Sequence, residues 1–496
     1  MSDHWASRVF PQLLPELAER IVGFVNRNEV ATSFRLVCKA TAAQLRGPEH
    51  TTIRLSQPVP AHTFASHWLA PGATRGLTLK QRLKLVSLTA ASGVVANLEV
   101  AAQAADCTLP YHIFVDIAAT GHLESCKRVW EHGKRWSKPY DALAAAAGGG
   151  HAHVCEWLLS LDPSLWTWAV AESSAPAAAR GGHAALSEWL LQWFEARVPA
   201  RADASDRRSL TRVRGLVLLG LAHCCDLATL QRYWRRWADA LQALRSAKER
   251  LLGAAAGSPT PDWAAKVEWL EAEGCPKCED AAWNAAAASD APARLTWLRD
   301  RGYAIGPLAF HVAARAGNLE AMQLLRPTHG TVGANGGNAG GEAGDNEYDE
   351  LEEQALSALG AATMGRQDVL QALHDAGCAL DLMHIKIHAA RSTGQLPVLA
   401  WLLQEYGPDR LGLDEPLFTS AAGSGSVGLL AWLRERGCAW HADAWEAAAG
   451  AGCVEALEWL AERGCPMPED GVERPDVLAL LEEHARGGGE GLPPAE

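Results

Sequence analysis

The chain has 496 residues, of which 48% are hydrophobic and 21% charged, a composition typical of a soluble, folded protein. Its net charge of −13 argues against general binding to nucleic acid or anionic membrane by the whole molecule. The nearest candidate for a membrane span, residues 215–222, is far shorter than the required about 20 residues, and the N-terminus lacks the pattern of a secretion signal. We therefore expect a cytoplasmic or nuclear protein with no membrane partner and twelve reduced cysteines.

Residues 13–45 have no counterpart elsewhere in the chain and predict two short helices. Leu14-Pro15 opens the first helix, and the sequence "NRN" at 26–28 ends it. Apolar residues expected to share one side of the first helix are Leu17, Ile21, Val22, Phe24 and Val25, and the second helix carries Val30, Phe34, Val37 and Cys38. About forty residues are too few to bury this surface alone, so we expect it to pack against the rest of the chain or another protein.

The same segment resembles an F-box. Leu14-Pro15, Glu16-Leu17, Ile21-Val22 and "RLVCK" at 35–39 follow the family's pattern, although Ala40 and Thr41 stand where the family usually has a Trp. The resemblance implies docking on the adaptor subunit of an SCF-type ubiquitin ligase. The contact residues it implies are Leu14, Pro15, Leu17, Ile21, Val22 and Phe24. The alternative is an amphipathic cap on the repeats that follow. We assign residues 1–50 to this module and 51–80 to a linker, with 51–60 as an extended link or a short strand.

Residues 81–486 contain a repeated pattern of two small residues, a Gly, and an apolar stretch that closes on Trp-Leu or Leu-Leu. The Gly position is held by Gly93, Gly121, Gly150, Gly182, Gly317, Gly365, Gly394, Gly425 and Gly452, and by Cys225, Asp262 and Asp290 in the middle of the series. Gly permits the left-handed turn that ends a helix. We predict an all-α solenoid of about twelve helix pairs, whose apolar faces are buried by stacking.

The sequence "FHVAARAGNLEAMQLL" at 310–325 resembles an ankyrin repeat, and the family's Gly-His recurs at 121–122, 150–151 and 182–183. The family's opening Thr-Pro is absent and most units are shorter than typical repeats, so we expect short, irregular connections. The resemblance implies that the repeats bind a target protein, whose identity the sequence does not reveal. With the F-box-like module, it implies a ubiquitin-ligase substrate receptor. The runner-up is an ankyrin scaffold that binds protein partners without recruiting a ligase.

Two motifs that suggest cofactor chemistry fall at repeat positions. Gly423, Gly425 and Gly428 match a dinucleotide-binding fingerprint, but the repeat places them at a helix corner rather than after a strand. Cys275 and Cys278 form a Cys-x-x-Cys without the second ligand pair that a structural zinc site needs. The position of Cys275 is shared with Cys378, Cys438 and Cys465. We therefore expect no cofactor and no metal, and we interpret these cysteines as packing residues.

Tryptophan is unusually frequent, with twenty residues in the chain. Seven of them occupy one repeat position: Trp157, Trp189, Trp269, Trp297, Trp401, Trp432 and Trp459. We predict that these seven belong to the core. Residues 201–250 are basic and include "RYWRRW" at 232–237. We interpret them as an exposed helix face with an apolar inner side, with RNA or phosphate binding as the less favoured alternative.

The remaining segments are not expected to be catalytic. The glycine-rich insertion at 327–353 (disordered over about 327–350) is predicted to be a loop, and its acidic end at 342–353 a solvated face. Residues 475–485 are predicted to form a capping helix, and 487–496 a flexible tail. The chain contains none of the metalloprotease, phosphate-loop, nucleophile-elbow or calcium-loop motifs, so we expect a binding protein rather than an enzyme.

Overall fold

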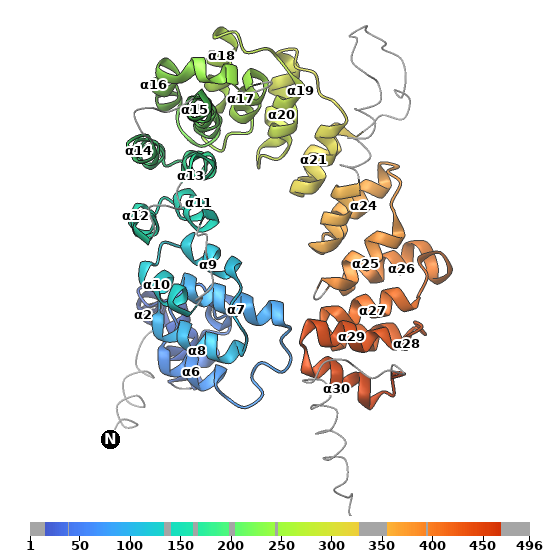
Figure 1. Ribbon diagram of the computed structural model, residues 1–496. Helices are drawn as coiled ribbons and strands as arrows, with labels where there is room; N and C mark the ends of the chain where they lie inside the picture. Colours follow the sequence, from blue (N-terminus) through green and yellow to red (C-terminus); the bar gives the residue numbers. More distant parts are fainter. Residues whose placement is uncertain are drawn as a thin grey trace, which may run out of the picture. The chain divides into compact units, whose positions relative to one another are not determined.

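A computed structural model of the chain describes residues 15–37, 39–132, 140–161, 167–197, 204–243, 247–326, 355–392 and 395–467 (Figure 1). These residues form helices and no strand, so the predicted all-α class is confirmed. The chain divides into two compact units, Met1–Val198 and Pro199–Glu496, and each is described by itself. The insertion expected at 327–353, the capping helix at 475–485 and the tail at 487–496 lie outside the described residues.

The first unit begins with a module of short helices and continues as helix pairs. The module comprises α2 (Pro15–Val22), α3 (Arg27–Thr32), the 3-10 turn η2 (Phe34–Leu36), α4 (Lys39–Gln44) and α5 (Pro48–Thr51). A single helix, α6 (Ala61–Trp68), follows. The pairs are α7 (Leu79–Ala91) with α8 (Val95–Ala105), α9 (Tyr111–Ala118) with α10 (Leu123–His132), α11 (Tyr140–Gly148) with α12 (Ala152–Leu161), and α13 (Trp168–Arg180) with α14 (Ala184–Glu195).

The second unit consists of further helix pairs. They are α15 (Ala204–Cys224) with α16 (Leu227–Trp237), α17 (Ala247–Ala256) with α18 (Trp263–Ala272), α19 (Glu279–Ala286) with α20 (Ala291–Asp300), α21 (Leu308–Ala316) with α22 (Leu319–Leu325), a helix over 355–363 with α24 (Gln367–Asp375), α25 (Leu382–Arg391) with α26 (Leu396–Leu411), α27 (Glu415–Ser424) with α28 (Val427–Glu435), and α29 (Asp443–Ala451) with α30 (Val454–Glu462). The 3-10 segment η4 (Ala238–Ala243) follows α16.

The described helices therefore form twelve pairs, and the predicted corner positions lie between the two helices of a pair. Gly394 is the exception because it lies outside the described residues. Each described corner glycine has a φ between 67° and 83°, the left-handed conformation that the pattern predicted. Within each unit, successive first helices contact one another, as α7, α9, α11 and α13 do.

Alanine makes the close contact between first helices possible. Ala146 and Ala147 of α11 are fully buried, as are Ala175 and Ala178 of α13, the helix that packs against it. A one-carbon side chain lets two helix backbones approach closely and leaves no long side chain to order. The second helices supply the larger apolar groups of the core, such as Leu158 in α12.

A second interaction joins several of the pairs to the next one. The carbonyl oxygens at the end of a first helix have no donor within that helix. A side chain directly after the corner of the following pair donates to one of them, and we call this contact a corner cap. The corner caps are His122 Nε2 to Ala91 O (3.1 Å), His151 Nε2 to Ala119 O (3.0 Å), Asn318 Nδ2 to Ala288 O (2.9 Å), Arg366 Nη2 to Gly317 O (3.1 Å) and Gln395 Nε2 to Thr363 O (3.3 Å).

Two pairs with an acidic corner obtain the cap from a different position. After Asp262 and Asp290, the donor stands four residues further on and is a longer cation, Lys266 or Arg294. Lys266 Nζ donates to Ala222 O (2.8 Å) and Cys225 O (2.9 Å), and Arg294 Nη1 donates to Ala256 O (2.8 Å) and Ser258 O (2.7 Å). Both side chains are buried, and Arg294 also pairs with Asp290 at 2.6 Å. The same helix ends are thus satisfied by another residue.

The prediction that seven tryptophans form the core is wrong for six of them. Trp401 is buried, and the other six are only half-buried. Some of the rings lie against the neighbouring second helix, as Trp157 does at 6.5 Å from Trp130 and Trp269 at 5.4 Å from Trp234. Several are also covered by a guanidinium, as Trp297 is by Arg301 at 4.6 Å. The repeat pattern predicts which tryptophans occupy the same position in their helices, but it does not show whether that position faces the core or a neighbouring second helix.

The cysteines that follow a glycine end the second helices. Cys275, Cys438 and Cys465 are buried, and Cys378 is half-buried. In each case the backbone N–H donates to a leucine carbonyl five residues earlier, as from Cys438 to Leu433 O (3.0 Å). The preceding glycine has positive φ in all four turns. Their interpretation as packing residues is confirmed.

The dinucleotide-like glycines lie at the corner between α27 and α28. Gly425 ends α27 with φ 70°, whereas Gly428 is inside α28 with no atom within 4 Å of an added Cβ. We expect Gly425→Ala to lower the free energy of unfolding by about 1–2 kcal/mol, because a Cβ is strained at positive φ. Gly428→Ala is the matched control and should raise it by about 0.5–1 kcal/mol. Urea unfolding measures both, and equal losses would contradict the corner assignment.

The buried cap Lys266 predicts a pH dependence. Burial lowers the pKa of this amine from 10.5 to about 8. Between these values the unfolded chain holds the proton and the folded chain does not, so the contribution of Lys266 to stability increases as pH rises from 8 to 10.5. The unfolding free energy of the wild type minus that of Lys266→Met should therefore increase from pH 7 to pH 10 in urea titrations. A constant or shrinking difference would show that the amine is not desolvated.

Candidate docking surface on the N-terminal module

A small apolar cluster organises the N-terminal module. Val22, Val30 and Leu45 are buried together, with Val25 and Phe34 packed against them. The predicted break between two helices is present, but the first helix already ends at Val22, and Arg27 and Asn28 belong to α3. Asn26 caps α3 by accepting from the backbone N–H two residues later (2.9 Å). The module thus gathers side chains from several short segments into a core of its own.

Asn28 fastens this module to the segment that follows it. The side chain is fully buried, and its Nδ2 donates to the carbonyl oxygens of Arg54 (2.8 Å), Gln57 (3.1 Å) and Pro58 (3.1 Å). Its Oδ1 accepts from the backbone N–H of Arg54 (2.8 Å). Both ends of the amide are therefore satisfied by one stretch of backbone.

The next residue of that stretch is held from the other side. Asn97 of α8 is buried, and its Nδ2 donates to the carbonyl oxygen of Val59 (2.8 Å). Residues 54–59 are consequently tied both to the module and to the first helix pair. Residues 51–80 were expected to be a linker, but in the structure they include the helix α6. Residues 51–60 form no strand. Side-chain amides that satisfy a buried backbone take the place of strand pairing.

The sequence predicts that the apolar residues of the first helix share one side, but in the structure they do not. Val22 points into the cluster, whereas Leu17 is 45% exposed, Ile21 40% and Phe24 89%. Leu17 and Ile21 are four residues apart and therefore lie on one face of the helix. The helix ends at Val22, so Phe24 belongs to the turn that follows. Neighbouring residues in a helix point about 100° apart, which separates Ile21 from Val22.

Two further exposed apolar residues were not assigned to the site from the sequence. Leu36 is 68% exposed and Val37 39% exposed. Both belong to the "RLVCK" stretch that carries the F-box resemblance, so the signal was present in the motif. Of the remaining assigned residues, Leu14 lies outside the described residues, and Pro15 is the first residue of α2.

These side chains can serve binding but not chemistry. Leu17, Ile21 and Phe24 carry no ionisable or nucleophilic group, and exposed apolar residues that lie together are a common feature of protein-interaction sites. Burying it against a partner is favourable by about 25 cal/mol for each Å² removed from water. The arrangement therefore fits a docking surface.

The basic segment of the second unit has a different character. In α16, Arg232, Arg235 and Arg236 are exposed, while Tyr233 and Trp237 are buried. The indole Nε1 of Trp234 donates to the Glu273 carboxylate (3.1 Å). The interpretation as an exposed helix face with an apolar inner side is confirmed, because these rings are engaged within the protein.

No helix in the described part of the chain combines the length and apolar character needed to cross a bilayer. No family model matches the chain, and no curated protein or solved structure matches it either. The exposed residues of the module are therefore interpreted from their own geometry.

The attachment by Asn28 predicts a local effect. Asn28→Ala removes the side-chain donor to the carbonyl oxygens of Arg54, Gln57 and Pro58 and the acceptor of the Arg54 amide, at a cost of about 1–3 kcal/mol. We expect the Arg54 amide to exchange its hydrogen at least about tenfold faster, measured by hydrogen exchange. Asn26→Ala is the control, because it removes only the helix cap and should leave the Arg54 amide protected. Equal protection in both variants would contradict the attachment.

Proposed function

We propose that the chain is the substrate receptor of an SCF-type ubiquitin ligase. The N-terminal module docks on the ligase's adaptor subunit as an F-box does, and the helix pairs, which resemble ankyrin repeats, hold a target protein. The single observation that carries the proposal is the exposure of Leu17, Ile21 and Phe24. These are three of the residues for which the F-box resemblance implies adaptor contacts.

The exposure also weighs against the alternative of a solenoid cap. A cap buries its apolar face on the repeats, but Leu17, Ile21 and Phe24 remain accessible in the folded unit. The module is attached to the first helix pair through residues 54–59 instead. Attachment through one segment leaves the apolar face of α2 available to a partner.

The repeats support the second half of the proposal. A series of helix pairs, most of them with a left-handed glycine at the corner, is what the ankyrin resemblance implies. Stacked repeats present extended surfaces that suit protein targets rather than small substrates. The mechanism is positioning: attachment of target and ligase to one chain raises their effective concentration, while ubiquitin transfer is carried out by other subunits.

The docking surface is tested with the full chain and a purified adaptor subunit. Leu17→Asp combined with Phe24→Asp should weaken binding at least about tenfold, because burying a carboxylate in an apolar contact is costly. Leu69→Asp is the matched control, since Leu69 is 46% exposed but lies outside the module. Calorimetry measures the affinities, and circular dichroism verifies that both variants are folded.

Two outcomes would overturn the proposal. If the wild type does not bind the adaptor, the module is no F-box and the chain is left as an ankyrin-like scaffold. If the double variant binds as tightly as the Leu69→Asp control, the adaptor contacts another surface.

A further inference from the structure

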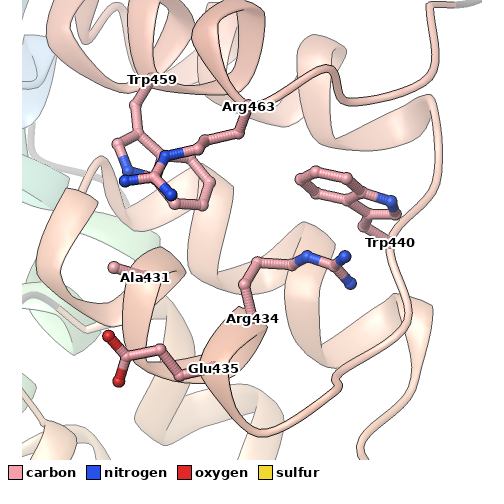
Figure 2. Close-up of a pocket in the computed structure, with 6 residues that line it drawn as sticks. All are labelled: Ala431, Arg434, Glu435, Trp440, Trp459 and Arg463. Atoms are coloured by element: carbon pink, nitrogen blue, oxygen red, sulfur yellow. The ribbon is translucent and has the colours of Figure 1, made fainter.

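A pocket opens in the second unit between α28, α30 and the segment that joins α28 to α29. Its volume is about 360 Å³ (Figure 2). The lining residues are Ala431, Arg434, Glu435, Trp440, Trp459 and Arg463. Two of the six are arginines and two are tryptophans, a combination that is enriched at the energetic centres of protein interfaces.

The two arginines are held by the two indole rings. The Arg434 guanidinium lies 3.7 Å from the centre of the Trp440 ring, and that of Arg463 lies 5.8 Å from the centre of the Trp459 ring (Figure 2). Arg434 Nη1 also donates to the carbonyl oxygen of Cys438 (2.6 Å). Stacking and this hydrogen bond restrict the side chains before any ligand arrives, which lowers the entropic cost of binding.

Neither guanidinium forms an ion pair with a described residue. Glu435, the acid in the pocket lining, pairs instead with Arg436 at 3.8 Å. Arg301 provides the contrast: it covers Trp297 in the same way, but it pairs with Glu268 and Glu271, each at 3.1 Å. Arg434 and Arg463 therefore hold positive charge for which the described chain supplies no carboxylate.

We propose that this pocket binds an acidic segment of a target protein. Carboxylates of the segment pair with Arg434 and Arg463, whose guanidinium groups match carboxylate geometry. An apolar side chain beside those carboxylates contacts Trp440 or Trp459. The inference rests on the proposed target-binding role of the repeats and specifies the chemistry of the target, but it does not depend on ligase recruitment.

The charge of the chain limits the ligand to a short acidic segment. With a net charge of −13, the protein repels an extended polyanion, whereas two carboxylates are matched by the two local cations. The local complementarity therefore favours a protein ligand.

The test uses the full chain and a fluorescein-labelled peptide of sequence Glu-Glu-Phe-Glu-Glu, with Gln-Gln-Phe-Gln-Gln as its uncharged counterpart. Fluorescence polarisation should show binding of the acidic peptide that weakens with added salt, and no comparable binding of the uncharged one. Arg434→Ala combined with Arg463→Ala should reduce affinity about tenfold or more. Arg410→Ala is the matched control, because the exposed Arg410 covers Tyr406 of α26 and does not line the pocket.

Equal binding of both peptides, no binding by the wild type, or an unchanged affinity in the folded double variant would each overturn the inference. The outcome is separable from the proposed ligase contact. The arginine double variant should still bind the adaptor, whereas Leu17→Asp combined with Phe24→Asp should still bind the acidic peptide.

Discussion

The structure depends on how the carbonyl oxygens at the end of each first helix are satisfied. A helix leaves these acceptors without internal donors, and burying them unpaired is costly. Here a side chain from the following pair donates to them, as His122 does to Ala91 O and Arg294 to Ala256 O. Where such a cap is present, the helix end is satisfied only when the neighbouring pair is in place. This local need, together with the alanine contacts between first helices, links the helix pairs along each unit.

The N-terminal module is attached by the same kind of interaction, a side chain that donates to backbone carbonyl oxygens, but it leaves apolar side chains exposed. Asn28 and Asn97 satisfy the backbone of residues 54–59 from two sides, so the module is joined to the first pair without covering α2. Leu17, Ile21 and Phe24 stay accessible as a result. The repeats bury their apolar groups in one another, whereas the module leaves part of its apolar surface exposed. This difference underlies the proposed division between ligase docking and target binding.

The sequence predicted the helix pairs well because glycine at a corner has a local cause: positive φ is strained for other residues, and the pattern repeats. It predicted side-chain direction poorly. Val22 and Ile21 were placed on one side although neighbouring residues of a helix point about 100° apart, and half-buried tryptophans were assigned to the core. The caps from Lys266 and the pocket between Arg434 and Arg463 join residues some thirty or more positions apart, so they depend on packing that no local pattern encodes.

Hydrogen exchange of the full chain, alone and with the purified ligase adaptor, tests the central claim most directly. The account predicts slower exchange in the presence of the adaptor for the amides of residues 17–24, with no change in α28 and α30. Unchanged exchange throughout the module, or protection confined to the repeats, would contradict the claim that the exposed apolar face of α2 is where the ligase docks.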